Sequence, residues 1–239
     1  MTIVMGLQGK DHVVMAADRL GHTLDGSGMY GFGSGKLHII SAGSREWVVG
    51  VAGSLDALTV VKAVSREALE GECAVNELET YADKLGEVCR HRGFEDDMWF
   101  LVAGIDKAGP FIYQISFLEQ ERDRGEGRKW IGPLSVGQTM GYCAIGAAAH
   151  GALYFASEHH KPEMSESQRL LLAHFCLTEA CKHDMRVGGP VDMAVVGNGP
   201  ARFIAESDAP VIVARSKFIA TRIGELLLAP YGETDLITK

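Results

Sequence analysis

The chain has 239 residues and a formal net charge of −8, with 46% hydrophobic and 23% charged residues. These values are typical of a globular protein with a sizeable core, and they exclude wholesale disorder. An acidic chain without a basic block argues against nucleic-acid binding, because phosphate contacts need clustered lysine and arginine. No apolar run approaches the roughly 18 residues that a membrane span requires.

Cysteine use and the first residues bear on the compartment. The five cysteines are odd in number and none forms a CxxC pair, which favours free thiols in a reducing cytosol. The N-terminal stretch carries acidic side chains and lacks a basic segment followed by an apolar one, so we expect no signal peptide. A cytoplasmic protein is therefore expected.

The first third of the chain predicts strands and then helices. Apolar runs at 2–8 and 12–17, separated by GKD, predict two strands joined by a tight turn, and KLHII and EWVVGVAG predict two more. The glycine-rich stretch 22–35 is predicted as a loop, and it lacks the pattern of a phosphate loop. The apolar period then lengthens, which predicts helices over 54–71 and about 77–92.

The rest of the chain repeats this order. MWFLVAGID, PFIYQISF, KWIG and GYCAIGA predict strands, and residues from about 149 to 159 predict a helix. Ser165 and Gln168 have the spacing of a capping box that opens a longer helix through about His183. PVDMAVVGN and ARFIAE predict a hairpin, and a weaker helix is predicted over about 216–228.

This order of elements predicts an α+β fold. Strand hairpins separated by helix pairs favour antiparallel sheets with helices packed outside, which a four-layer αββα sandwich would accommodate. The sequence contains no internal repeat or linker, so we expect a single domain over 1–239 with a C-terminal tail from about 206.

The chemistry begins at Thr2. A threonine hydroxyl is a poor nucleophile unless a base takes its proton, and a free α-amine with a pKa of about 7.7–8.0 can be that base. Methionine is usually removed when the next residue is small. Removal of Met1 would therefore expose nucleophile and base on one residue.

Three further residues stand where such a site needs them. Lys36 opens the third predicted strand, and its charge would lower the pKa of a nearby amine or hydroxyl. Asp18 ends the second strand and can partner that lysine. Gly53 lies at a strand–helix junction, where backbone N–H groups favour a developing oxyanion. Alternatives without a catalytic role stay open: Thr2 without a function, a surface ion pair between Asp18 and Arg19, and an ordinary lysine at a strand edge.

These segments resemble N-terminal-nucleophile (Ntn) hydrolases, the β-type subunits of the 20S proteasome and the bacterial HslV peptidase. The similarity runs over roughly 2–205 through TIVMGLQGKDHVVMAADR, GKLHII, VGVAGSLDAL, FLVAGID, AIGAAAHGAL and HDMRVGGPVDMAVV, in order. The resemblance implies an αββα sandwich, amide-bond hydrolysis, no metal or organic cofactor, and a homo-oligomeric ring of six or seven subunits, often stacked in pairs. An ATPase unfoldase is a candidate partner, and peptides or unfolded proteins are the substrates implied.

The resemblance also assigns roles. Thr2 would be the nucleophile and its amine the base, Asp18 and Lys36 the supporting pair, and Gly53 the oxyanion donor. Asp184 matches a late aspartate that organises the amine end.

One further position bears on specificity. Val51, just before the oxyanion glycine, is expected to line the pocket for the residue that precedes the cut, which favours apolar side chains.

The chain departs from the family at two positions. Ala147 and Val187 stand where serines are usual, which removes hydroxyls near the amine. We also expect no propeptide, which favours the HslV-like arrangement. The tail past about 206 is longer than usual, and we expect it to contact a neighbouring subunit.

Two rival functions follow. The first is a non-proteolytic amidase or an inactive structural ring subunit with the same fold. The second is a metal-dependent hydrolase that uses His159, His160 and Glu163, but adjacent helical histidines diverge by about 100° and their spacing matches no usual ligand set. We favour a threonine-type peptidase subunit of a self-compartmentalised ring.

Overall fold

The computed structural model describes residues 2–22, 29–31, 35–42, 45–54, 56–69, 78–92, 98–117, 135–138 and 141–228. Its strands are β1 (Ile3–Gln8), β2 (Val13–Asp18), β3 (Leu20–His22), β4 (Met29–Gly31), β5 (Leu37–Ala42), β6 (Arg45–Gly53), β7 (Met98–Ile105), β8 (Pro110–Phe117), β9 (Ser135–Gln138), β10 (Tyr142–Gly146), β11 (Val191–Val196) and β12 (Arg202–Ile204). Its helices are α1 (Asp56–Leu69), α2 (Leu78–Arg92), α3 (Ala149–His159), α4 (Glu166–His183), the short 3-10 helix η1 (Glu206–Asp208) and α5 (Pro210–Leu228).

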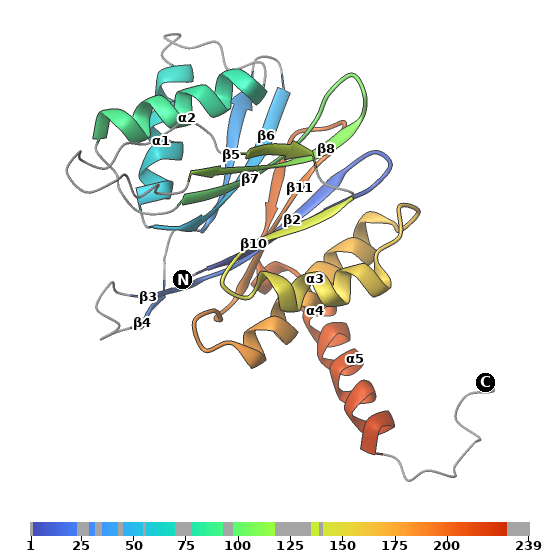
Figure 1. The fold of residues 1–239 in the computed structure, drawn as a ribbon. Helices are drawn as coiled ribbons and strands as arrows, with labels where there is room; N and C mark the ends of the chain where they lie inside the picture. Colours follow the sequence, from blue (N-terminus) through green and yellow to red (C-terminus); the bar gives the residue numbers. More distant parts are fainter. Residues whose placement is uncertain are drawn as a thin grey trace.

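Two five-stranded antiparallel sheets stack face to face (Figure 1). The first has the order β10-β1-β2-β11-β12 and the second the order β5-β6-β7-β8-β9, with β3 and β4 as a separate ribbon. Helices α1 and α2 cover the outer face of the second sheet, and α3 and α4 cover the outer face of the first (Figure 1). The four-layer αββα sandwich expected from the sequence is confirmed.

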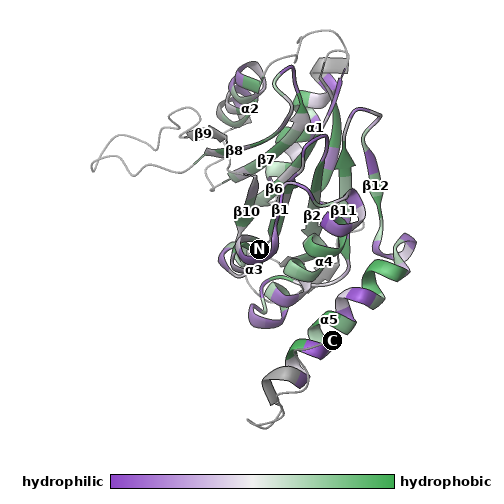
Figure 2. Ribbon diagram, turned by 90° about the vertical axis from the view of Figure 1, so that its right-hand side faces the viewer, coloured by the Kyte–Doolittle hydropathy of each residue, from purple (hydrophilic) through white to green (hydrophobic). Residues whose placement is uncertain are grey.

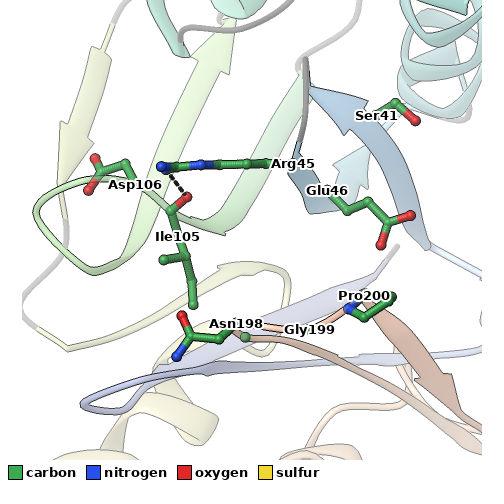
Figure 3. A pocket seen from close by; sticks show the side chains of 9 residues that line it. Ser41, Arg45, Glu46, Ile105, Asp106, Asn198, Gly199 and Pro200 are labelled. Atoms are coloured by element: carbon green, nitrogen blue, oxygen red, sulfur yellow. Dashed lines mark hydrogen bonds between the residues drawn. The ribbon is translucent and has the colours of Figure 1, made fainter.

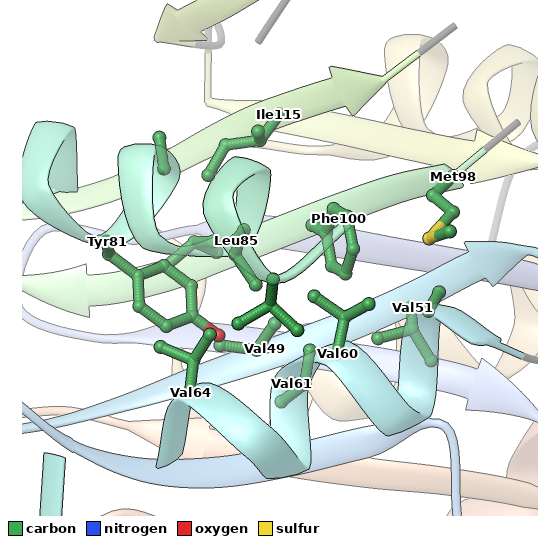
Figure 4. Close-up of a cluster of buried hydrophobic side chains, with 14 of the residues drawn as sticks. Val49, Val51, Val60, Val61, Val64, Tyr81, Leu85, Met98, Phe100 and Ile115 are labelled. Atoms are coloured by element: carbon green, nitrogen blue, oxygen red, sulfur yellow. The ribbon is translucent and has the colours of Figure 1, made fainter. Parts of the chain in front are cut away.

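Three hydrophobic clusters fill the spaces between the four layers. One joins α1 and α2 to the second sheet, and its side chains, Val49, Val60, Tyr81 and Phe100 among them, interlock in Figure 4. A second cluster joins α3, α4 and the first sheet. The third lies between the two sheets. Every space between neighbouring layers is thus closed by apolar side chains.

The strand β1 shows why its sequence is almost continuously apolar. Ile3, Met5 and Leu7 point to the helix side of the first sheet, whereas Val4 points to the second sheet. A strand buried on both faces cannot alternate apolar and polar residues as a half-exposed strand does. Gly50 of β6 lets the sheets approach, since a Cβ there would meet Val4 Cγ1 at 2.4 Å.

Most predicted elements are found within a few residues. The capping box is present, because the Ser165 side chain accepts from the Gln168 N–H while the Gln168 side chain accepts from the Ser165 N–H. The prediction of a loop over 22–35 was wrong in part, because 29–31 form β4, which pairs with β3. Helix α5 begins at Pro210, earlier than the predicted 216. The predicted strand KWIG lies outside the described residues.

Candidate active site

The carboxylate of Asp18 joins three segments of the chain. It ends β2 and is fully buried at 0% exposure. Its Oδ1 accepts hydrogen bonds from the Ile3 N–H at 2.9 Å and from Lys36 Nζ at 2.6 Å. Its Oδ2 accepts one from the Gly188 N–H at 3.0 Å. A buried charge needs such partners, and here they come from β1, from the residue before β5 and from the loop before β11.

Lys36 is buried against this carboxylate. The lysine is 6% exposed, and its Nζ also donates to the Leu20 carbonyl oxygen at 2.6 Å. Burial lowers the pKa of Lys36, and the charge of Asp18 opposes that shift. The expected Asp18–Lys36 pair is therefore present, whereas Arg19 pairs with Asp192 of β11 instead of Asp18.

The backbone of Thr2 is fixed on both sides. Thr2 directly precedes β1 and is 9% exposed. Its carbonyl oxygen accepts from the Ala147 N–H at 2.9 Å, and the following N–H, of Ile3, is bound by Asp18. Gly146 has a φ of +100°, and a Cβ there would meet the Thr2 carbonyl oxygen at 1.9 Å, so only glycine fits. The threonine is thus held beside the carboxylate that binds the lysine.

Gly53 is the last residue of β6, the strand that pairs with β5. It lies at the end of this strand pair where Lys36 precedes β5. The Val51 N–H donates to the Lys36 carbonyl oxygen at 3.0 Å, and Gly53 follows two residues later on β6. Its φ of +93° turns the chain out of the strand. The Ser54 hydroxyl then accepts from the Asp56 N–H at 3.2 Å, at the first turn of α1. Gly53 therefore lies between a strand end and a helix start, as expected.

Asp184 directly follows α4 as its C-cap residue and binds an arginine. Its carboxylate accepts from Arg186 at the backbone N–H (2.9 Å), at Nε (2.8 Å) and at Nη2 (2.7 Å). Cys181 lies one helical turn before it. Burial raises the pKa of Cys181 to about 12, Asp18 and Asp184 contribute in the same direction, and Lys36 opposes them. The Asp184 carboxylate thus raises the pKa of Cys181 together with Asp18, and it also binds the Arg186 guanidinium.

Cys181 was expected only as one of the free thiols, and the charges of Asp18 and Lys36 that affect its pKa were not anticipated. It stands on α4, whereas the charges that act on it belong to β2 and to the residue before β5. Its half-buried thiol packs against the cluster between α4 and the first sheet. No local pattern signals a neighbour that arrives through tertiary packing.

The remaining positions face the helix layers. Val51 is 6% exposed and packs in the cluster with α1, where it neighbours Val60 in Figure 4. Val187 is 3% exposed in the cluster on the other outer face, and Ala147 packs partly against that cluster. At both positions, where the resembled family usually has serine, the side chain is apolar and packs on the helix side of the first sheet.

A cleft of about 390 Å³ opens beside the buried pair. Gly35 and Leu37, which flank the lysine, line it together with Arg19 and Asp192. A Cβ on Gly35 would meet Asp192 Oδ2 at 2.8 Å, so the glycine leaves room for this ion pair. The cleft therefore adjoins the site on the side of β5.

A larger cleft of about 660 Å³ lies at the other end of the sandwich (Figure 3). It is lined by Arg45, Asp106 and the turn from Gly197 to Pro200, which follows β11. Since Val196 of β11 pairs with the first residue of β2 and Asp18 is the last, this cleft is far from the Thr2 end. It does not belong to the candidate site.

The metal-dependent alternative is not supported by the described residues. They contain no group of three or more side chains able to hold a metal ion, and His160 of the metal alternative instead contacts the Gln8 carbonyl oxygen through Nε2 at 2.8 Å. The described helices include none long and apolar enough to cross a membrane.

Comparison with known proteins places the fold. No family model matches the chain, and no curated protein matches its sequence. Among solved structures, Anbu (ancestral beta-subunit) from Yersinia bercovieri superposes with a TM-score of 0.71 at 18% identity, over 96% of this chain and 98% of that chain. The Anbu (Gly-1) mutant from Hyphomicrobium sp. strain MC1 gives 0.68 at 16% identity, over 95% and 96%. The chain thus shares the fold of these Anbu structures along almost its whole length.

Proposed function

We propose that this protein is a threonine-type peptidase subunit, with Thr2 as the N-terminal nucleophile once Met1 is removed. The observation that carries the proposal is the pair of hydrogen bonds that Asp18 Oδ1 accepts, one from the backbone N–H of Ile3, the residue after Thr2, and one from Lys36 Nζ. That carboxylate brings a buried ammonium group alongside the N-terminal strand. An N-terminal hydroxyl amino acid next to such a cation has what amide hydrolysis requires.

In the proposed reaction the Thr2 hydroxyl oxygen attacks the carbonyl carbon of a peptide bond while its proton passes to the Thr2 α-amine. The tetrahedral intermediate collapses when that proton moves to the leaving nitrogen and the C–N bond breaks, which leaves an ester on Thr2. A water molecule then attacks the ester, with the amine again accepting the proton and returning it to the hydroxyl. Hydrolysis thus consumes one water and restores the threonine.

The other residues support these steps. The charge of Lys36 would favour the neutral amine and the developing alkoxide, and Asp18 holds that charge in place. Gly53 would donate its N–H to the oxyanion at the start of α1. Asp184 is proposed to help organise the amine end from α4, and Val51 to shape an apolar pocket for the residue before the cut.

We further propose that the subunit acts within a cytoplasmic homo-oligomeric ring on peptides or unfolded proteins, with an ATPase unfoldase as a candidate partner. Support comes from the likeness to a protein described as an ancestral β-subunit. Mass measurement of the native assembly would give the number of copies. A protein that stays monomeric at all concentrations would contradict the ring.

The decisive experiment compares wild type with Thr2→Ala and Thr2→Ser. We expect purified protein to begin at Thr2 by intact mass, wild type to cleave apolar fluorogenic peptides, Thr2→Ser to retain part of the activity and Thr2→Ala to lose it. The exposed Thr59 of α1 provides a control, since Thr59→Ala should change nothing. Full retention of Met1, or activity in Thr2→Ala, would defeat the proposal.

A second candidate is a non-proteolytic amidase or an inactive ring subunit. It is favoured by the apolar side chains of Ala147 and Val187, which pack towards the helix layer and offer no hydroxyl to hold an amine. The two candidates separate on substrates. An amidase would hydrolyse small amides but not peptides, whereas an inactive subunit would hydrolyse neither although it begins at Thr2.

A further inference from the structure

The larger cleft lies outside the candidate active site and has the size of a ligand site. Its volume of about 660 Å³ falls within the roughly 300–1,000 Å³ that small-molecule sites usually have. One wall is the turn between β11 and β12, which is hydrophilic and lies at the end of these strands away from α5 (Figure 2). Residues of β5, β6 and the β7–β8 turn form the other wall (Figure 3). The cleft therefore opens between the rims of the two sheets.

Three charged side chains in this cleft are each held by a backbone group. Arg45 Nη1 donates to the Ile105 carbonyl oxygen at 2.6 Å (Figure 3). Glu46 Oε2 accepts from the Ala201 N–H at 2.7 Å, and this bond joins the two sheets. Asp106 Oδ1 accepts from two N–H groups of its own turn. The walls and their charges are therefore positioned in advance, which lowers the cost of binding a ligand.

The same side chains keep part of their hydrogen-bonding capacity free. Within the described part of the chain none of the three forms an ion pair, and Arg45 Nη2, Glu46 Oε1 and Asp106 Oδ2 have no hydrogen-bond partner. Arg45 and Asp106 are exposed and Glu46 is half-buried, so a ligand can reach all of them. Asn198, on the opposite wall, adds a side-chain amide (Figure 3).

The charges define the chemistry of a complementary ligand. A guanidinium group pairs with a carboxylate, and a carboxylate pairs with a positively charged nitrogen. The cleft has one positive charge, on Arg45, and two negative charges, on Glu46 and Asp106. The ligand that matches it has one negative and two positive charges. An α-amino acid with a cationic side chain has this set of groups.

We propose that this cleft binds a free basic α-amino acid, L-lysine or L-arginine. The carboxylate of the amino acid pairs with Arg45, and its α-ammonium and side-chain cation pair with Glu46 and Asp106. A lysine within a peptide is a poorer match, because a peptide bond removes the charge of its α-amine, its carboxylate or both. The proposal does not depend on hydrolysis, so Thr2→Ala should bind the amino acid as wild type does.

Calorimetric titration of the full chain with L-lysine and L-arginine measures this binding directly. Three analogues of lysine each lack one charge: L-norleucine lacks the side-chain ammonium, aminocaproate lacks the α-ammonium and cadaverine lacks the carboxylate. Each analogue leaves one charged group of the cleft without its partner. We therefore expect each to bind wild type at least about tenfold more weakly than L-lysine does.

Three variants remove the same charges from the protein. Arg45→Gln, Glu46→Gln and Asp106→Asn should each weaken L-lysine binding at least about tenfold. The two amides keep an oxygen for the N–H groups that the carboxylates now bind. Arg45→Gln should not weaken cadaverine binding, because cadaverine has no carboxylate for Arg45 to hold. The matched control is Arg215→Gln, which makes the same change at an exposed arginine of α5 and should bind L-lysine as wild type does.

Several results would overturn the proposal. It is wrong if neither L-lysine nor L-arginine binds at concentrations up to about 10 mM, or if the analogues bind as tightly as L-lysine. It also fails if the cleft variants, shown to be folded by circular dichroism, lose no more affinity than Arg215→Gln. Loss of binding in Thr2→Ala would assign the amino acid to the candidate active site instead. Should a cleft variant not fold, the analogue series on wild type decides alone.

Discussion

Replacing Asp18 by asparagine is the most direct perturbation of the candidate site. The substitution keeps the size of the side chain and removes its charge. It leaves Lys36 6% exposed without a counter-ion. In the wild type the Gly188 N–H donates to Asp18 Oδ2 at 3.0 Å. If the amide oxygen of the introduced asparagine still accepts from Ile3 and Lys36, the NH₂ group of the asparagine faces this N–H, and two donors then meet. One buried hydrogen bond is then lost together with the ion pair.

These losses set the expected magnitude. Removing one partner of a buried, hydrogen-bonded ion pair typically costs about 3–5 kcal/mol, a large part of the roughly 5–15 kcal/mol that stabilises a domain. We expect Asp18→Asn to lower the free energy of unfolding by about that amount in urea titrations. The Asp18→Asn/Lys36→Met double variant should recover about 1–3 kcal/mol of the summed single losses, because no charge is left unpaired. A loss in Asp18→Asn below about 1 kcal/mol, or strict additivity, would refute the reasoning.

The same pair predicts a pH dependence with a definite sign. The pKa of Lys36 is lowered from its usual 10.5, chiefly by burial, so the folded state binds this proton less readily than the unfolded state. The resulting contribution to stability is fully present above 10.5 and is lost as the pH falls through the lower folded value. Wild type should therefore gain stability relative to Lys36→Met as the pH rises towards 10.5. A constant difference between the two would contradict the burial of this lysine.

Three further predictions concern residues around the fold. Gly146→Ala should lower the melting temperature and abolish any Thr2-dependent activity, because its Cβ would lie 1.9 Å from the Thr2 carbonyl oxygen, whereas Gly199→Ala, with nothing within 4 Å, should be neutral. Burial lowers the pKa of His38 to about 4, so stability should fall as the pH drops from 6.5 to about 4, by at most about 3 kcal/mol, and His38→Gln should flatten the curve. Arg169→Met should cost about 2–4 kcal/mol in urea titrations, because this fully buried guanidinium donates to the Pro162 carbonyl oxygen at 2.6 Å.

Each of these outcomes has a clear opposite. An unchanged melting temperature in Gly146→Ala would mean that the β10 end can move away from Thr2. An equally steep acid loss in His38→Gln would assign that loss to other groups. Wild-type stability in Arg169→Met would show that the loop between α3 and α4 holds without its arginine.

Local signals account for the parts of the fold that were predicted well. The start of α4 was predictable because Ser165 and Gln168 form reciprocal capping hydrogen bonds within one helical turn. The β3–β4 ribbon was not, because its strands are three residues long and stand in glycine-rich sequence that looks like loop. Helix α5 was placed too late because its first turn starts at Pro210, a residue that reads as a breaker but suits the first helical position.

The candidate site divides in the same way. Asp18, Lys36 and Gly53 could be nominated because each stands at the end of a recognisable strand. The partners that hold the aspartate were out of reach, since the Gly188 N–H comes from 170 residues away. Arg19 makes the same point: an ion pair with its sequence neighbour Asp18 was an open alternative, but its guanidinium binds Asp192, 173 residues along the chain. Partners that arrive through tertiary packing leave no pattern in the sequence.

The apolar residues at 147 and 187 bear on the choice between the proposed functions. Ala147 still holds Thr2 through its backbone N–H, and Val187 is buried below the same sheet, so neither substitution loosens the N-terminal strand. Unlike the serines usual in the resembled family, they offer no hydroxyl to the proposed amine base, whereas the buried Lys36 ammonium group donates to the same Asp18 oxygen that accepts from the Ile3 N–H. In the proposed mechanism the hydroxyl nucleophile depends on the lysine cation to lower the pKa of the hydroxyl, and the α-amine base depends on being held in place. In that mechanism the site therefore supports activation of the hydroxyl better than orientation of the amine, so proton transfer is the step on which the peptidase and inactive-subunit proposals differ.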